Sequence, residues 1–113
     1  MSVSESFLKL VLDLMTPFGE IRSRKMFGGV SIYLDDVIVA LLDDDRFYLK
    51  VDDQTRPLFE SQGFKAFQPY GPEGGPMSYN EYPVDWLEDT ELSRHWVELA
   101  LEAALRKKTK RNR

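Results

Sequence analysis

The chain has 113 residues, a formal net charge of −4 and no cysteine, with 42% hydrophobic and 30% charged residues. This length fits one domain that buries a core without disulfides or a structural metal, and the composition is that of an ordinary globular protein. The lack of cysteine excludes disulfides, thiol nucleophiles and cysteine-ligated zinc. No apolar run approaches the roughly 20 residues of a membrane helix, and the N-terminus carries no basic signal segment, so we expect a cytoplasmic protein without membrane contact.

A helix is predicted near the N-terminus. Ser2 followed by Glu5 is a capping-box pattern and would start the helix at Val3. Apolar residues then recur at helical spacing, namely Phe7, Leu8, Val11, Leu12, Leu14 and Met15. Pro17 would end the helix, because the residue before a proline is pushed out of the α region.

The segment from residue 24 to residue 51 is predicted to form three consecutive strands and to be the centre of the fold. The strands are Lys25–Leu34, Val37–Leu42 and Phe47–Val51. The aspartates at 35–36 and 43–45 would form the two turns, since aspartate tolerates positive φ. The glycine pair at 28–29 lies inside the first predicted strand, where it indicates a bulge or a close approach of two backbones.

The second half of the chain is predicted to add two helices and two strands. A helix would run from Thr55 to Gly63, and a last helix from Asp89 or Thr90 to about Lys107. Between them, strands are predicted at 64–67 and 77–82, separated by a loop rich in glycine and proline. The order helix, three strands, helix, two strands, helix predicts a two-layer α+β domain, with helices packed on an antiparallel sheet.

The candidate catalytic and metal-binding residues all lack a recognisable pattern. His95 has no second histidine or cysteine with which to form a metal site or a dyad. The aspartates at 43–45 lack the spacing of a calcium loop, and Gly28-Gly29 belongs to neither a Walker nor a dinucleotide fingerprint. We therefore expect no metal, no cofactor and no enzymatic activity.

The C-terminus stands apart by charge. Six of the 15 Lys and Arg residues fall in the last eight positions, which leaves nine basic residues against 19 acidic residues before them. We expect a domain over residues 1–105 and a disordered, solvated tail over residues 106–113. Clustered basic residues attract phosphate, so a nucleic-acid contact is the alternative, although the acidic body opposes a broad nucleic-acid surface.

One face of the predicted sheet is left without an explanation. Alternation places Tyr33, Tyr48 and Lys50 opposite the apolar residues of the same strands. Such residues can form ordinary cross-strand pairs, a protein-docking patch or a platform on which bases stack. The residue types alone leave these three interpretations open.

Several motifs resemble one known family, the N-terminal domain of the TfoX competence regulators. The residues that carry the resemblance are Arg24-x-Met26-Phe27-Gly28-Gly29-x-x-Ile32-Tyr33, Phe47-Tyr48-Leu49-Lys50-Val51-Asp52, Met77-Ser78-Tyr79 with Tyr82-Pro83, and the helix LSRHWVELALEAALR. The resemblance implies the same α+β order, in a fold like that of type III secretion chaperones. It also implies a role in turning on DNA-uptake genes by assisting a transcription factor, without catalysis.

We therefore expect a regulatory domain that binds a protein partner, such as a transcription regulator, or a second copy of itself. The expected binding residues are Arg24, Phe27, Gly28, Gly29, Tyr33, Tyr48, Lys50 and Tyr79. One alternative is a nucleic-acid binder that uses the tail residues Arg106, Lys107, Lys108, Lys110, Arg111 and Arg113. Another is a small-molecule site in a pocket between the sheet and the helices.

Overall fold

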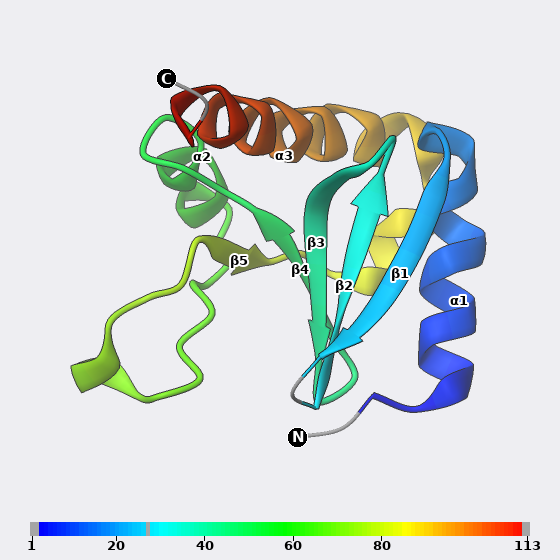
Figure 1. The fold of residues 1–113 in the computed structure, drawn as a ribbon, viewed down its shortest axis with the longest axis horizontal. Helices are drawn as coiled ribbons and strands as arrows, with labels where there is room; N and C mark the ends of the chain where they lie inside the picture. Colours follow the sequence, from blue (N-terminus) through cyan, green and yellow to red (C-terminus); the bar gives the residue numbers. More distant parts are fainter. Residues whose placement is uncertain (1–2, 27, 112–113) are drawn as a thin grey trace.

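The computed structural model describes residues 3–26 and 28–111, which form one antiparallel sheet with helices packed against it (Figure 1). The sheet has five strands in the order of the chain: β1 (Ile21–Met26), β2 (Gly29–Leu34), β3 (Val37–Asp43), β4 (Arg46–Lys50) and β5 (Tyr79–Glu81). The helices are α1 (Glu5–Met15), α2 (Arg56–Ser61) and α3 (Thr90–Arg111), with single 3-10 turns η1 (Thr16–Phe18), η2 (Pro72–Gly74) and η3 (Val84–Glu88). The predicted α+β class is confirmed.

The two acidic turns lie where the sequence predicted them. Asp35 and Asp36 join β2 to β3 with φ values of 50° and 70°, and Asp44 and Asp45 join β3 to β4 with 53° and 55°. Aspartate is one of the few residues other than glycine that adopts this left-handed conformation readily. The tight turns therefore fix the antiparallel register of β2, β3 and β4.

The positions of two strands differ from the prediction. The expected strand Lys25–Leu34 is a hairpin, in which the chain reverses at Gly28, with φ of 84°, between β1 and β2. The expected strand at 64–67 contributes only an isolated bridge between Ala66 and Asn80. Four strands therefore precede α2 and one follows it, where three and two were expected.

Gly29 explains why the glycine pair is needed at this place. A Cβ atom on Gly29 would lie 2.9 Å from the carbonyl oxygen of Leu42 in the neighbouring strand β3. Gly28 supplies the reversal and Gly29 supplies the close approach. The predicted close approach of backbone is therefore present, but at a strand end rather than in a strand interior.

Two helix boundaries differ from the prediction, the start of α1 and the end of α3. α1 begins at Glu5, where the Ser4 hydroxyl caps it by accepting a hydrogen bond from the Phe7 amide (3.2 Å). It ends at Met15, before Pro17 as predicted. At the other terminus α3 is drawn to Arg111, past residue 106, where the sequence predicted that a disordered tail begins.

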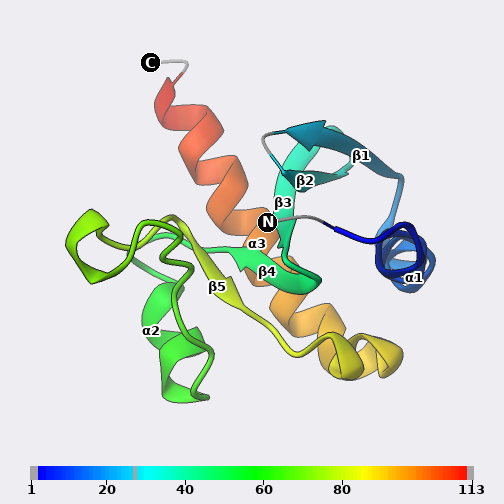
Figure 2. The same ribbon diagram turned by 90° about the horizontal axis from the view of Figure 1, so that it is seen from below.

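The core lies between one face of the sheet and the helices α1 and α3, and we call this the closed face. The sheet contributes Val30, Ile32, Leu34, Ala40, Leu42, Phe47 and Leu49, and the helices contribute Val11, Met15, Trp96, Val97 and Ala100. Figures 1 and 2 show α1 beside β1 and α3 crossing the sheet where β3 begins and β4 ends. Among the described residues no helix has the length and apolar character needed to cross a membrane.

A cluster of aromatic rings closes one end of this core. Phe59 of α2 meets Trp96 of α3 at 4.9 Å between ring centroids, and Phe64 meets Tyr82 at 5.5 Å. The Tyr82 hydroxyl forms a hydrogen bond of 2.8 Å with the Ser93 hydroxyl, which in turn donates to a backbone carbonyl of η3 (2.7 Å). The buried polar atoms here are thus satisfied, as a stable interior requires.

Candidate binding site on the open face of the sheet

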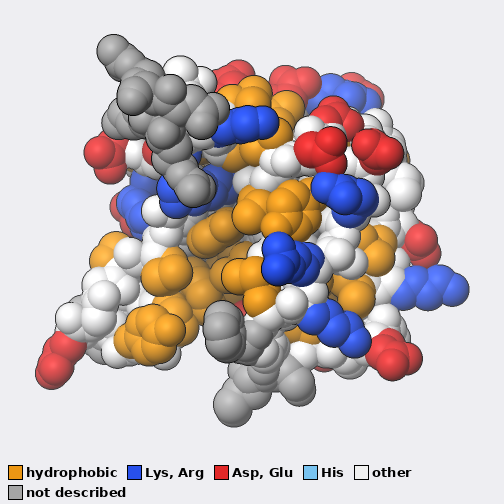
Figure 3. All heavy atoms as spheres, viewed as in Figure 1, with side chains coloured by type: hydrophobic (Ala, Val, Ile, Leu, Met, Phe, Trp, Pro, Cys, Tyr) orange, Lys and Arg blue, Asp and Glu red, His pale blue; other side chains and the backbone are white. Residues whose placement is uncertain are grey.

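Within residues 3–26 and 28–111, no helix packs over most of the second face of the sheet, and we call this the open face. Cross-strand pairing aligns Ser31, Leu41 and Tyr48 on this face, and pairs Lys50 with Tyr79 at one end of it. β1 adds Arg22 and Arg24 by alternation, because Arg22 pairs with Tyr33 and Arg24 pairs with Ser31. Figure 3 shows the result, in which hydrophobic side chains gather at the middle of the surface with Lys and Arg side chains among and around them.

Lys50 is the most unusual residue of the open face. The residue is only 5% exposed, and its ammonium lies 4.9 Å from the centroid of the Tyr79 ring. Burial, followed by the positive charge of the nearby Lys107, lowers the pKa of Lys50 to about 8. Burial at this position disfavours the charged form of the lysine, and the fold does not need a charged residue here.

Two tyrosines flank the buried lysine. Tyr79 is half-buried, and burial, followed by the nearby Tyr33, raises the pKa of its hydroxyl. The guanidinium of Arg22 lies 5.7 Å from the centroid of the Tyr33 ring and forms an ion pair with Asp36. Each tyrosine therefore has a cation over its ring, an arrangement that electrostatic attraction to the ring face favours.

These groups line a hollow where the end of the sheet meets the last turns of α3. The hollow has a volume of about 470 Å³ and is lined by Tyr33, Asp36, Val37, Ile38, Lys50, Tyr79, Ala104, Lys107 and Lys108. We call it the tyrosine–lysine hollow. A smaller recess of about 280 Å³ adjoins it and shares Lys50 and Lys107 with it.

An ion pair fixes α3 against the sheet beside this hollow. The Arg106 guanidinium donates to both carboxylate oxygens of Asp52, with N–O distances of 2.6 and 3.0 Å. The carboxylate also accepts from the backbone amides of Gln54 and Thr55. The hydrogen bonds from Arg106 are the main reason that the pKa of Asp52 falls to about 2.

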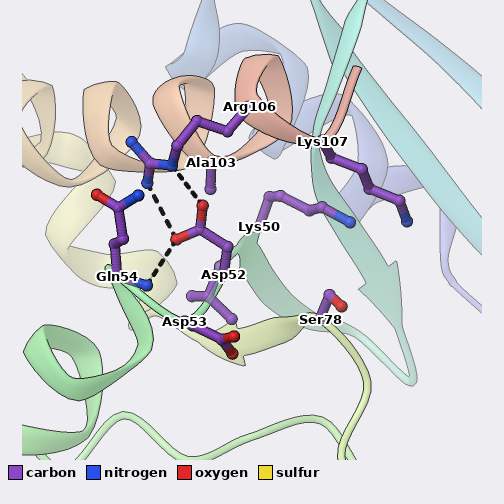
Figure 4. Close-up of a pocket in the computed structure, with 9 residues that line it drawn as sticks. Lys50, Asp52, Asp53, Gln54, Ser78, Ala103, Arg106 and Lys107 are labelled. Carbon is purple, nitrogen blue, oxygen red and sulfur yellow. Dashed lines mark hydrogen bonds and ion pairs between the residues drawn. The ribbon is translucent and has the colours of Figure 1, made fainter. Parts of the chain in front are cut away.

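Figure 4 shows how the two lysines lie relative to this ion pair. The Lys50 and Lys107 side chains point the same way, away from the Asp52–Arg106 pair. Asp52 is thus held by Arg106, while Lys50 and Lys107 both contribute to the lining of the hollow. The position of Lys107 follows from the anchored helix, since it is the residue after Arg106.

The structure brings together only some of the residues that the sequence predicted for a binding site. Tyr33, Lys50 and Tyr79 meet in the hollow, and Lys107 and Lys108 of the predicted tail complete it. The remaining predicted residues are placed elsewhere or not described: Tyr48, Arg24, Gly28, Gly29, Phe27, Arg106, Lys110, Arg111 and Arg113.

Tyr48 lies on the predicted face but is covered. It is 8% exposed, and its ring lies 4.5 Å from the Phe67 ring, which belongs to the loop between α2 and β5. Its ring therefore packs between the sheet and this loop, whereas the sequence analysis placed it among the expected binding residues. Arg24 is exposed on β1, whereas Gly28 and Gly29 form the β1–β2 reversal.

The tail residues do not share one role. Arg106 forms the ion pair with Asp52, and Lys107 and Lys108 line the hollow. Lys110 and Arg111 are the last two residues of α3. Phe27 and Arg113 lie outside the described residues.

Sequence reasoning missed Asp52, Asp36 and Arg22 as parts of this region. Asp52 and Arg106 are 54 positions apart, so no local pattern joins them. The only signal for Arg22 was its place in the consecutive polar residues 22–25, three of them basic, which is typical of an exposed edge strand. In the part of the chain that the structure describes, no group of three or more His, Cys, Asp or Glu side chains could hold a metal ion.

Comparison with known proteins places the chain in a family. The family model for the TfoX N-terminal domain matches residues 13–104. Protein Sxy of Escherichia coli (strain K12) is 28% identical over 103 residues, which cover 88% of this chain and 48% of that protein. DNA transformation protein TfoX1 of Aliivibrio fischeri is 30% identical over 66 residues, 58% of this chain and 30% of that protein.

A third relative is closer to this chain in size. The uncharacterized 12.7 kDa protein in the trpE 5' region of Spirochaeta aurantia is 34% identical over 61 residues, 54% of this chain and 53% of that protein. The aligned part of this chain thus spans about half the length of these relatives or less. Because the family match runs from α1 through the whole sheet and into the second half of α3, the chain belongs to the TfoX N-terminal domain family.

Proposed function

We propose that this chain is a regulatory module that acts by binding a protein partner and not by catalysis. The family supports a regulatory role, and one relative is named a DNA transformation protein. We extend that role to this chain as control of DNA-uptake genes, exerted in the cytoplasm through a transcription regulator. The alternative occupant of the same surface is a second copy of this chain.

The open face is the observation that carries this proposal. Its middle is apolar and aromatic, and no helix packs over it along most of its length (Figure 3). Met26, which lies on this face by alternation and accepts from Ser31, is more than 40% exposed, and Tyr33, Phe67 and Tyr79 are half-buried. Exposed methionine and tyrosine gathered on one surface are typical of protein-docking sites.

The charges on this face indicate an acidic partner. Arg24 projects from β1, and Lys107 and Lys108 line the hollow. The acidic residues nearby are already paired, Asp36 with Arg22 and Glu81 with Arg46. The rest of the molecule is acidic, with 19 Asp and Glu residues in a chain of net charge −4. A basic patch on an acidic protein favours an acidic protein segment, because the body would repel the long phosphate backbone of a nucleic acid.

The test is capture of interacting proteins by the purified full chain, with identification by mass spectrometry. We expect a transcription regulator to be captured by the wild-type chain and lost with the double variant Arg22→Glu/Arg24→Glu. The matched control is Lys9→Glu/Arg94→Glu, which reverses the same number of charges on α1 and α3 instead of on the sheet.

Both double variants are first checked for a melting temperature close to that of the wild type, and two outcomes would then overturn the proposal. Equal capture by both double variants would remove the open face as the docking surface. Tight binding of duplex DNA that weakens steeply with salt would favour the nucleic-acid interpretation instead.

A further inference from the structure

The tyrosine–lysine hollow has properties that protein docking does not explain. Lys50, which lines the hollow, is only 5% exposed. Its ammonium lies near the Tyr79 ring and the Lys107 ammonium. Among the residues that the structure describes, no carboxylate forms an ion pair with Lys50. A buried ammonium group beside a second ammonium costs free energy unless an anion joins them.

The carboxylates around the hollow do not supply that anion. Asp36, in its wall, is paired with Arg22, and Asp52, beside it, is paired with Arg106. What remains are the three ammonium groups of Lys50, Lys107 and Lys108 and, in the adjoining recess, the carboxylate of Asp53. The hollow therefore has an excess of positive charge although the chain as a whole is acidic.

The walls of the hollow indicate what else the ligand carries. Tyr33 and Tyr79 offer ring faces, and Val37, Ile38 and Ala104 add apolar surface. The volume of about 470 Å³ lies in the usual range of small-molecule sites, roughly 300–1,000 Å³. Aromatic walls beside cations suit a flat ring that bears a negative group.

We propose that the tyrosine–lysine hollow binds a small phosphate monoester carried on a planar ring, the chemical class to which nucleoside monophosphates belong. Phosphate fits better than a single carboxylate because it brings close to two negative charges to several ammonium groups. Lysine binds phosphate as a point charge, without the flat pairing geometry by which arginine recognises carboxylate. The family match ends at residue 104, so Lys107 and Lys108 lie beyond it.

Binding would also have a structural consequence. The ligand would join Lys50 of β4 to Lys107 of α3, next to the Asp52–Arg106 pair that already ties these two segments. It would thus brace the end of α3 against the sheet. Bound phosphate would favour the charged form of Lys50, which burial otherwise disfavours.

The test uses the purified full chain and isothermal titration with four probes, namely adenosine 5'-monophosphate, phenyl phosphate, inorganic phosphate and adenosine. We expect the two ring phosphates to bind, and inorganic phosphate and adenosine each to bind at least about tenfold more weakly, since each lacks one half of the contacts. Lys50→Met should weaken binding of adenosine 5'-monophosphate by about tenfold or more, the loss of a charged hydrogen bond. Lys9→Met, an exposed lysine of α1, is the control and should bind as the wild type does.

The proposal is overturned if neither ring phosphate binds at millimolar concentration, or if Lys50→Met binds as the wild type does. Adenosine as tight as its monophosphate would exclude the anion site, and inorganic phosphate as tight as the ring phosphates would exclude the role of the tyrosines. Lys107→Glu is a second variant that does not alter the buried position, and it should weaken binding at least as much as Lys50→Met does. The titration needs no protein partner, so its failure is distinguishable from failure of the proposed docking function.

Discussion

The two faces of β4 have opposite relations to the stability of the fold. On the closed face, Phe47 and Leu49 are fully buried among apolar neighbours, as any two-layer domain requires. On the open face, Lys50 is almost equally buried, but among tyrosine rings and other cations. The difference teaches that burial alone does not identify the core, because the chemistry around a buried residue decides whether it stabilises the fold.

The largest expected change in the free energy of unfolding comes from truncating a side chain in the core of the closed face. Phe59→Ala should lower the free energy of unfolding by about 3–5 kcal/mol, since it leaves a cavity among the aromatic rings. Tyr33→Ala, on the open face, should cost less than about 1 kcal/mol. Urea denaturation monitored by circular dichroism measures both. Equal losses for the two variants would contradict the distinction between the faces.

The next effect has the opposite sign. Lys50→Met should raise the free energy of unfolding at pH 7 by about 1–3 kcal/mol, because it replaces a buried charge with an apolar chain of similar length. The folded-state pKa of about 8 lies below the ordinary 10.5, so the wild type gains stability as pH rises from about 8 to 10.5. The advantage of the variant should shrink over that interval. Lys9→Met should show no such dependence, and a loss of stability in Lys50→Met would mean that the ammonium supports the fold.

A smaller loss is expected within the closed face. Tyr82→Phe removes the hydroxyl that bonds Ser93, which should cost about 1–2 kcal/mol of unfolding free energy. Tyr70→Phe, at 78% exposure, is the control and should be neutral. Thermal unfolding of the two variants is sufficient to compare them. A neutral Tyr82→Phe would show that the Ser93 hydroxyl is satisfied by the η3 carbonyl alone.

The smallest effect concerns the ion pair that holds α3 to the sheet. Asp52→Asn keeps an oxygen for the amides of Gln54 and Thr55 but loses the charge, and should cost about 1 kcal/mol at pH 7, since the pair is partly exposed to solvent. The folded-state pKa of about 2 lies below the ordinary 3.8. The wild type therefore has this stability above about pH 4 and loses it as pH falls toward 2. The two proteins should converge in stability near pH 2, and Asp53→Asn should match the wild type throughout.

Most of the closed face could be predicted from the sequence because its signals are local. The alternation of Val30 and Ile32, and the aspartate turns, each depend on residues a few positions apart. The β1–β2 hairpin was missed because β1 is an edge strand of mostly exposed polar residues, which lacks the apolar alternation of a half-buried strand. The apolar segment at 64–67 was predicted as a strand, but it pairs with the sheet at a single bridge, between Ala66 and Asn80.

The hollow could be predicted only in part. Alternation placed Tyr33 and Lys50 on one face, but it could not show that Tyr79 and the end of α3 would bury Lys50. The distant pair between Asp52 and Arg106 joins the end of α3 to the segment after β4, and the helix runs past the point where its charge pattern suggested a free tail. Contacts between residues far apart in sequence were the missing information.

The exposed edge of the sheet has a consequence for how the protein behaves at high concentration. β1 lies at one end of the strand order and presents Arg22, Arg24 and Lys25, all exposed, along six residues. If two copies joined these edges in the usual antiparallel way, rows of like charges would lie against each other. The strand thus resists the continuous edge-to-edge addition that leads to aggregates. A homodimer of this chain would have to use a surface other than the β1 edge.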